Sequence, residues 1–338
     1  MVEDDSSSKS HSNKWKSKLL SSSLPLEYEV ARVLGNAGYR VSADYSFHRR
    51  TEGHDVEWSV DIRAIRETVH VPGADRGCAS DLLVECKHRS RASAWLFIPV
   101  PPGRSVPAEY EVIRGVEEFT PWFLHETQWY LSEFGVPTCY KGTEVDLGNG
   151  HVESAELRHA FSQLQFAIPP LLSGRIGVPA TSFDVIENTP FFFVPILVTN
   201  ARLFVARSDF GIGRVETAAE LADLSNEADC LLVDLAPGQD FFFHARRHLQ
   251  SLMDAVKRKG IQAAEQHRRE EGVHAYELPS SLAQRVAVAG DEVEAITNVS
   301  YLIVARFEYL SQLIQRVNEI TDRVAIHATQ KRPEFLKF

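Results

Sequence analysis

The stretch DLLVECKHRS, residues 81–90, has the apolar run of a buried strand but carries charges near its end. Residues 82–84 are Leu, Leu and Val, and a short apolar run of this kind is typical of a strand. Glu85 and Lys87 interrupt the run. Burying a carboxylate and an ammonium group costs free energy unless the two are paired, hydrogen-bonded or bound to a metal. The stretch therefore predicts a buried strand with a polar site at its end. The alternative is a solvated strand end with an ion pair worth at most about 1 kcal/mol.

Strand parity brings the charges of this stretch together with those of the strand before it. Residues two apart in a strand share a face, so Glu85 and Lys87 project together. Residues 56–65, VEWSVDIRAI, alternate like a strand and put Asp61 on their polar face. If the two strands pair, Asp61 approaches Glu85, and facing carboxylates raise each other's pKa. A divalent cation removes that conflict, and Mg²⁺ or Mn²⁺ prefers oxygen ligands of this kind. We therefore expect Asp61 and Glu85 to hold a metal. We expect Lys87 to orient or deprotonate an attacking water, or to stabilise charge on a phosphate.

A helix expected just before the first strand offers a further acid. Its sequence, PLEYEVARVLGNAGYRV, places apolar residues on one face and ends at two glycines. Glu27 stands beside the packed face, so we expect it to reach the carboxylate pair, and we expect Glu29 to be solvated. The alternative for Glu27 is an acid that only stabilises the positive end of the helix dipole.

The remaining pattern predicts an α/β protein. Further strands are expected within residues 39–47, 191–209 and 230–235, and a helix is expected after Ser154. From about residue 244 the pattern is helical, with an apolar stripe that serves internal packing or a dimer seam: Leu310, Ile314, Val317, Ile320 and Val324. We expect a disordered polar tail over 1–23, a domain over 24–243 with an insertion at about 99–153, and a C-terminal helical region over 244–338.

The helix acid, the strand Asp and the Glu-x-Lys pair, in this order, resemble the PD-(D/E)xK nuclease superfamily. The stretch LEYEVARVLGNAGYRV resembles the first helix and strand of its restriction-endonuclease-like and Mrr-like members. VPILVTNARLFVAR resembles the strand pair that follows their second core helix. The resemblance covers roughly residues 24–210 and implies a mixed β-sheet flanked by helices. It implies metal ligation by Asp61 and Glu85, catalysis by Lys87, and assistance by Glu27. Val60 replaces the proline of the family motif, and about 50 residues are inserted between Lys87 and the second helix.

Four further polar residues are candidates for contact with nucleic acid. His88, Arg89 and Arg91 follow the Glu-x-Lys pair, where they either contact phosphates or form a solvated basic loop. Gln163 of the stretch SQLQ lies where some members of the superfamily carry a polar residue near the site. Its alternative is a residue of the polar helix face.

Composition places few limits on these expectations. The chain has 338 residues and a hydrophobic fraction of 44%, which suffices for a sizeable core. Its net charge of −10 argues against a surface that binds nucleic acid everywhere, but it permits a local basic groove. The four cysteines form no CxxC pair, which predicts free thiols in a reducing cytoplasm. The polar N-terminus lacks the apolar core of a signal peptide, and its lysines either solubilise the chain or contact an anionic partner. No apolar run reaches the roughly 18 residues of a membrane-spanning helix.

Together these observations predict a cytoplasmic, Mg²⁺-dependent nuclease. The expected substrate is DNA, cut internally, with restriction or phage defence as the expected setting and a homodimer through the C-terminal helices as a possible assembly. One alternative is a catalytically inactive nucleic-acid-binding or assembly subunit with the same fold. Another is an interaction subunit that docks through its C-terminal helices.

Overall fold

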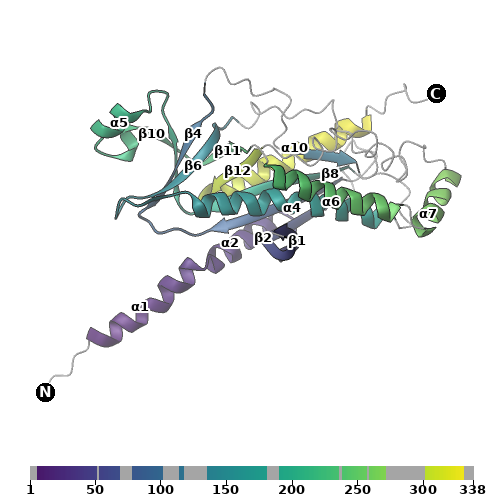
Figure 1. Ribbon diagram of the computed structural model, residues 1–338, viewed down its shortest axis with the longest axis horizontal. Coiled ribbons are helices and arrows are strands. Elements are labelled where there is room, and N and C mark those ends of the chain that lie inside the picture. The colour runs from purple at the N-terminus through teal and green to yellow at the C-terminus, as the bar shows by residue number, and fades with distance from the viewer. Residues whose placement is uncertain are drawn as a thin grey trace.

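The computed structural model shows one mixed β-sheet with helices on both faces (Figure 1). It describes residues 6–51, 53–68, 78–101, 114–117, 135–180, 190–235, 238–256, 259–271 and 301–330. An α/β architecture was expected from the sequence, and it is confirmed. Among the described residues, no helix combines the length and the apolar character needed to cross a membrane.

The elements are as follows. The α-helices are α1 (Ser6–Ser21), α2 (Leu24–Asn36), α4 (Ala155–Ala180), α5 (Ile212–Thr217), α6 (Gln239–Val256), α7 (Lys259–Glu270) and α10 (Leu310–Gln330). The strands are β1 (Arg40–Thr51), β2 (His54–Thr68), β3 (Cys78–Lys87), β4 (Ser93–Pro99), β5 (Arg114–Glu117), β6 (Thr138–Asp146), β7 (Val152–Glu153), β8 (Pro190–Thr199), β9 (Arg202–Ala206), β10 (Ser225–Ala228), β11 (Cys230–Asp234) and β12 (Tyr301–Arg306).

The sheet is built around β3, the strand predicted from DLLVECK. Along the sheet the order is β1-β2-β3-β8-β12-β11-β6-β4-β9-β10. The first three strands are antiparallel, whereas β3 and β8 are parallel, with α4 between them in the chain. A parallel pair needs such a crossover because the chain must return to the same end of the sheet. Every side chain of β3 from Cys78 to Cys86 is buried, as expected for a strand covered on both faces.

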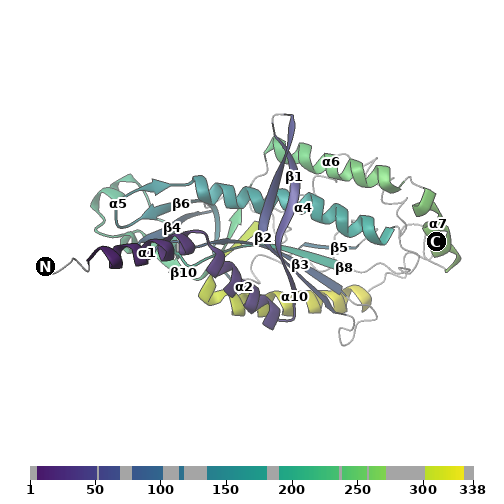
Figure 2. The same ribbon diagram turned by 90° about the horizontal axis from the view of Figure 1, so that it is seen from below.

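Two apolar cores lie on opposite faces of the sheet. Leu83 belongs to the core under α4 and α6, and Val84 and Cys86 belong to the core under α2 and α10. Figure 2 shows these two pairs of helices on either side of the strands. The alternation predicted for β3 is therefore confirmed, and it directs Glu85 and Lys87 toward the α4 side.

The hairpin β1–β2 bends at Asp44. Val41 packs against the core under α2, but Phe47, further along the same strand, packs in the core under α4. Asp44 lies between them with φ 52°, a left-handed conformation that Asp adopts more readily than most residues. The ladder between β1 and β2 is interrupted at this point, where Asp44 faces Asp61 across the two strands.

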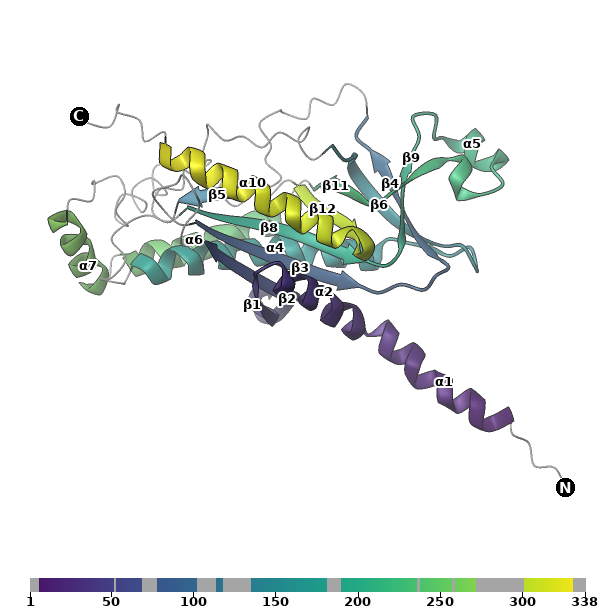
Figure 3. The ribbon, with the colours of Figure 1, turned by 180° about the vertical axis from the view of Figure 1, so that it is seen from behind.

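The N-terminal tail differs from its expected state. We predicted disorder over residues 1–23, but Ser6–Ser21 form helix α1, which projects away from the sheet (Figure 3). Neither glycine nor proline interrupts this segment, and lysine and leucine favour helix. The side chains of residues 14–22 are all exposed, so a polar sequence is compatible with the helix. Residues 1–5 lie outside the described part of the chain.

The C-terminal region is not purely helical, which corrects the expected boundary at residue 244. β12 lies inside the sheet, parallel to β8 and antiparallel to β11. Helix α10 does form, and the described members of its apolar stripe, Leu310, Ile314, Val317 and Ile320, are buried in the core under α2 and α10. These four side chains therefore pack within the chain and are not available as a dimer seam. Residues 272–300 and 331–338 are outside the described structure.

The expected insertion at about 99–153 is also part of the sheet. β6 pairs with β11 and with β4, and β5 pairs with the first half of β8. The segment therefore extends the same sheet and is not a separate module. Residues 102–113 and 118–134 are not among those described.

Candidate active site

Asp61, Glu85 and Lys87 meet at the carboxyl end of β3. The β2–β3 ladder runs as far as the pair Ile62 and Val84, so Asp61 and Glu85 face each other one step further. The backbone N–H of Cys86 donates to Asp61 Oδ2 at 2.7 Å, and Asp61 N lies 3.4 Å from Glu85 Oε2. Lys87 Nζ lies 2.8 Å from Glu85 Oε1. The predicted approach of the two carboxylates is confirmed.

Burial and mutual repulsion make this cluster unfavourable when it is fully ionised. Glu85 is completely buried, and burial followed by the charge of Asp61 raises its pKa to about 7, against the opposing effect of Lys87. Burial also raises the pKa of Asp61, although the Cys86 N–H bond and Lys87 oppose this. Burial lowers the pKa of Lys87, but its ion pair and hydrogen bond with Glu85 outweigh that effect and raise the pKa overall. Two carboxylates and one ammonium group thus share a poorly solvated space, which disfavours the ionised form of both carboxylates.

Glu27 extends the cluster from the first turn of α2. Its side chain is half-buried, and burial, Asp61 and Asp44 raise its pKa to about 7. Glu29, two residues later, is exposed as expected. A helix-dipole role alone does not explain this environment, because a favourable dipole lowers the pKa of an acid.

Asp44 is a fourth carboxylate that the sequence reasoning did not identify. It is exposed on β1 opposite Asp61, and its charge contributes to the raised pKa values of Glu27 and Asp61. The available signal was an acidic residue inside a predicted strand. Nothing in the sequence indicated the bend that turns Asp44 toward the site.

The donor set fits a divalent cation by its chemistry. Asp61, Glu85 and Glu27 offer carboxylate oxygens, the ligands that Mg²⁺ prefers, and a cation would relieve their repulsion. Asp61 Oδ2 already accepts from Cys86, and Glu85 Oε1 is paired with Lys87. Among the described residues, no three His, Cys, Asp or Glu side chains are grouped as a metal site would require. Because Glu85 is already paired with Lys87, a bound cation would compete with Lys87 for the Glu85 carboxylate.

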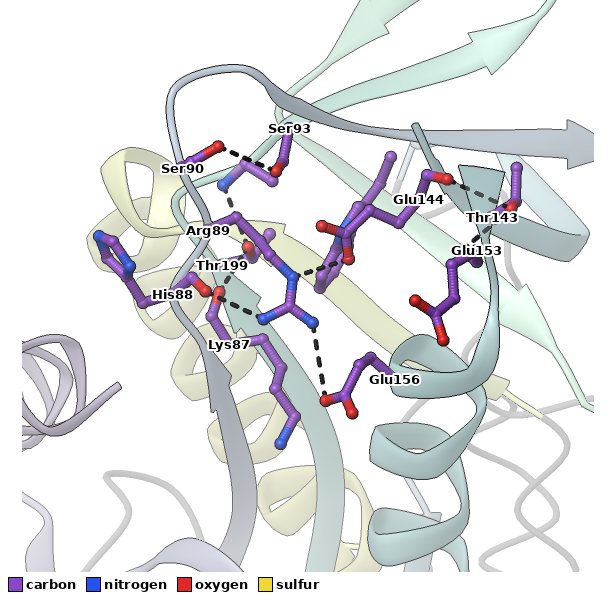
Figure 4. A network of polar contacts seen from close by, with 12 residues as sticks. Lys87, His88, Arg89, Ser90, Ser93, Thr143, Glu144, Glu153, Glu156 and Thr199 are labelled. Carbon is purple, nitrogen blue, oxygen red and sulfur yellow. Dashed lines mark hydrogen bonds and ion pairs between the residues drawn. The ribbon is translucent and has the colours of Figure 1, made fainter. Parts of the chain in front are cut away.

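Arg89 lies at the rim of the site but is held by carboxylates of other elements (Figure 4). Its Nε donates to Glu144 Oε2 at 2.7 Å, and its Nη2 lies 3.9 Å from Glu156 Oε2. Its backbone N–H and C=O both bond to the side chain of Asn200, at 2.7 and 2.8 Å. Arg89 therefore fastens the segment after Lys87 to β6, α4 and the turn after β8. Its guanidinium is engaged by groups within the protein.

Thr199 and Asn200 also position the site, which sequence reasoning missed. Thr199 Oγ1 donates to the carbonyl of Lys87 at 2.7 Å and accepts from Ala201 N at 3.0 Å. These two residues follow the apolar run of β8, where the sequence predicted only a turn near Asn200. Short polar side chains at a turn beside a charged strand end were the available signal.

The three other candidates for nucleic-acid contact differ in their surroundings. His88 N donates to Ser23 Oγ at 2.9 Å, and burial and Arg89 lower the pKa of its imidazole, which is therefore neutral at pH 7. Arg91 is exposed on the loop before β4. Gln163 Nε2 donates to the carbonyl of Ser59 at 2.8 Å, so it supports the bent hairpin two residues before Asp61.

A second buried charge on β3 has a structural explanation. Asp81 is fully buried, and its Oδ1 accepts from Nε and Nη2 of Arg63 at 2.9 and 2.7 Å. Arg175 Nε donates to Oδ2 at 2.9 Å. Asp81 and Glu85 share a face of the strand, but Asp81 is paired with two guanidinium groups.

Comparison with protein-family models, curated proteins and solved structures gives no significant match for this chain.

Proposed function

We propose that this protein is a metal-dependent nuclease that hydrolyses phosphodiester bonds, with DNA as its substrate. The observation that carries the proposal is the meeting of Asp61, Glu85 and Lys87 at the end of β3, with Glu27 beside them. The order of elements supports it further. A helix and three antiparallel strands come first, and after the strands β4 to β7 a crossover helix and a strand parallel to β3 follow, an order that the resemblance to PD-(D/E)xK nucleases implies apart from β4 to β7.

In this proposal each residue of the site has a separate role. Asp61 and Glu85 bind the cation, and Glu27 supplies a third carboxylate from α2. When held there, Mg²⁺ or Mn²⁺ would supply a lower pKa for the attacking water and positive charge for the phosphate. Lys87 is released from part of its pairing with Glu85 and donates hydrogen bonds to the attacking water or the phosphate. Thr199 and Asn200 hold the backbone around Lys87 in place.

The direct test is a cleavage panel. Purified protein is incubated with plasmid, linear duplex, single-stranded and branched DNA and with RNA, each with Mg²⁺, Mn²⁺ or EDTA. We expect metal-dependent cleavage of at least one DNA form. If no nucleic acid is cut with either metal, the proposal fails.

A second candidate function is a catalytically inactive nucleic-acid-binding subunit. The Lys87–Glu85 pair favours it, because the ammonium group of Lys87 already neutralises the carboxylate that a metal cation would otherwise bind. In that case DNA binding is insensitive to EDTA and to the substitution Asp61→Ala. Metal-dependent binding or cleavage rules it out.

Metal binding is expected to strengthen as pH rises through 7. Glu27 and Glu85 have pKa values of about 7, so both are mostly protonated at pH 6 and mostly ionised at pH 8. Because only ionised carboxylates bind metal, we expect Mg²⁺ affinity to rise by about 10- to 100-fold over this range. Isothermal titration calorimetry at pH 6, 7 and 8 measures it, preferably with Mn²⁺ as a second probe.

Two variants sharpen this prediction. Glu27→Gln should reduce the pH dependence, because only Glu85 would still titrate near pH 7, whereas Glu29→Gln, at an exposed acid on the same helix, should leave it unchanged. The same pKa values predict that the metal-free protein loses stability as the pH rises from about 4.5 to 7. Over this range the folded state binds more protons than the unfolded state. A metal affinity that is equal at pH 6 and 8 would contradict the assignment of these carboxylates as ligands.

A further inference from the structure

Helix α1 is anchored beside the candidate active site. The turn after it is closed by bonds from Ser22 N to the Lys18 carbonyl and from Ser23 N to the Leu20 carbonyl, both at 3.1 Å. Ser23 is buried, and its Oγ accepts from the N–H of His88, the residue that follows Lys87. α2 begins at the next residue and carries Glu27 in its first turn. The last turn of α1 is therefore tied to the end of β3.

The charge of α1 is opposite to that of the whole chain. Its sequence, SSSKSHSNKWKSKLLS, has four lysines and no acidic residue, whereas the chain carries a net charge of −10. Lys14, Lys16 and Lys18 are exposed. Lys14 and Lys18 are four residues apart and share one side of the helix. A basic element is thus placed next to the cluster of carboxylates.

An exposed apolar stripe runs between the lysines. Trp15 is 58% exposed and Leu19, one turn later, is 41% exposed. Helical spacing places this stripe between Lys14 and Lys18 on one side and Lys16 on the other. Lys16 Nζ lies 5.8 Å from the centre of the Trp15 ring. An aromatic ring flanked by ammonium groups suits a partner that has phosphates and flat bases.

The position of α1 relative to the sheet also fits a partner of this kind. In Figure 2, α1 and the strands β4, β6 and β10 extend to the same side of the molecule. Figure 3 shows α1 diverging from those strands, with the end of β3 where the two arms separate. The base of α1 lies beside the end of β3, because Ser23 Oγ accepts from the N–H of His88, the residue after Lys87.

We propose that α1 binds the phosphate backbone of the nucleic acid on which the site acts. The inference rests on the proposed function, and it assigns substrate binding to a segment that the sequence predicted to be a disordered tail. A helix of 16 residues is about 24 Å long, which corresponds to about seven phosphates of one strand. Contacts of lysine with phosphates carry no base information, so this binding is independent of sequence.

The test compares DNA binding of full-length variants in EDTA, where no cleavage takes place. The lysine variant is K14Q/K16Q/K18Q. The matched control, R246Q/R247Q/R269Q, removes three exposed positive charges from α6 and α7, which lie away from α1 (Figure 2). Fluorescence anisotropy with a labelled duplex is measured from 50 to 200 mM salt.

We expect the lysine variant to bind about 10- to 100-fold more weakly at 0.1 M salt, with a salt dependence reduced by about two to three ions. The control should bind like the wild type. The single substitution Trp15→Ala should also weaken binding relative to the wild type. In the wild type, Trp15 fluorescence should change when DNA is added. Thermal unfolding is expected to be unchanged in the lysine variant, because its three substitutions are exposed.

Equal binding by the lysine variant and the wild type would overturn the inference, even if the wild type cleaves DNA. Conversely, lysine-dependent binding by a protein that cleaves nothing would uphold the inference and refute the proposed nuclease. Lysine-dependent binding to anionic phospholipid vesicles without binding to DNA would assign α1 to a membrane surface instead. Self-association that the substitution Trp15→Ala abolishes, without DNA binding, would assign the stripe to a second copy of the chain.

Discussion

Replacing Lys87 with alanine is expected to lower Mg²⁺-dependent cleavage by about 10²- to 10³-fold, which is the usual effect of removing a preorganised hydrogen-bond donor to developing charge. Lys87 Nζ lies 2.8 Å from Glu85 and is the ammonium group that adjoins the carboxylates. Single-turnover cleavage of a labelled duplex, with protein in excess, measures the effect without interference from product release.

The same substitution should also change the electrostatics of Glu85. Lys87 opposes the upward shift of the Glu85 pKa, so its loss raises that pKa further above 7. Glu85 would then be protonated at pH 7, and the buried pair would be replaced by a neutral acid. We therefore expect the variant to fold, because no buried charge is left without a partner.

The control for Lys87 is Lys141→Ala, an exposed lysine on β6. It should cleave at the wild-type rate. If Lys87→Ala cleaves within about threefold of the wild type while Asp61→Asn is inactive, Lys87 is not part of the chemistry. If neither substitution matters, the observed cleavage does not come from this site.

The site was predictable from sequence where it depended on strand periodicity. The two-residue period of a strand holds whatever surrounds it, so the stretch DLLVECK was enough to place Glu85 and Lys87 on one face. The approach of Asp61 followed from a single assumption, that consecutive strands pair. Nuclease activity, metal binding and the DNA substrate remain predictions.

The parts that were missed depend on backbone conformation or on distant partners. Asp44 joins the cluster because the chain adopts φ 52° at that residue, and many sequences with an acid in a strand do not bend there. Arg89 was a candidate for phosphate contact, but its partner Glu144 is 55 residues away in the sequence. No local pattern reveals such a pair.

Two errors in the fold have separate origins. The run YLIVAR at 301–306 lies a few residues before a long amphipathic helix, and a short apolar run fits a strand or a helix equally well. Its neighbours β8 and β11 decide the outcome in the structure. For α1, low hydrophobicity suggested disorder, although residues 6–21 contain no helix breaker.

Replacing Asp81 with alanine is expected to lower the free energy of unfolding by about 3–5 kcal/mol, the usual cost of removing one partner from a buried charge network. Asp81 is fully buried and neutralises both Arg63 and Arg175, which come from β2 and α4. Without the carboxylate, Arg63 would lose the partner of its ion pair, and Arg175 would keep Glu67, whose Oε1 lies 3.8 Å from its Nη1. Urea denaturation followed by circular dichroism measures the loss.

Two controls separate charge from packing at Asp81. Asp81→Asn keeps the shape and some hydrogen bonds, so it should lose less stability than alanine, because the two arginines retain an acceptor. Asp55→Ala removes a carboxylate whose pair with Arg247 is about half exposed, and water screening should leave the unfolding midpoint nearly unchanged. If Asp81→Ala unfolds at the wild-type midpoint, the network contributes little, and the charge of β3 at this position would require another explanation.

Because Asp81 and Glu85 lie on the same face of one strand, comparing Asp81→Ala with Lys87→Ala distinguishes two uses of a buried carboxylate. The first should lower stability, and the second should lower cleavage in a folded protein.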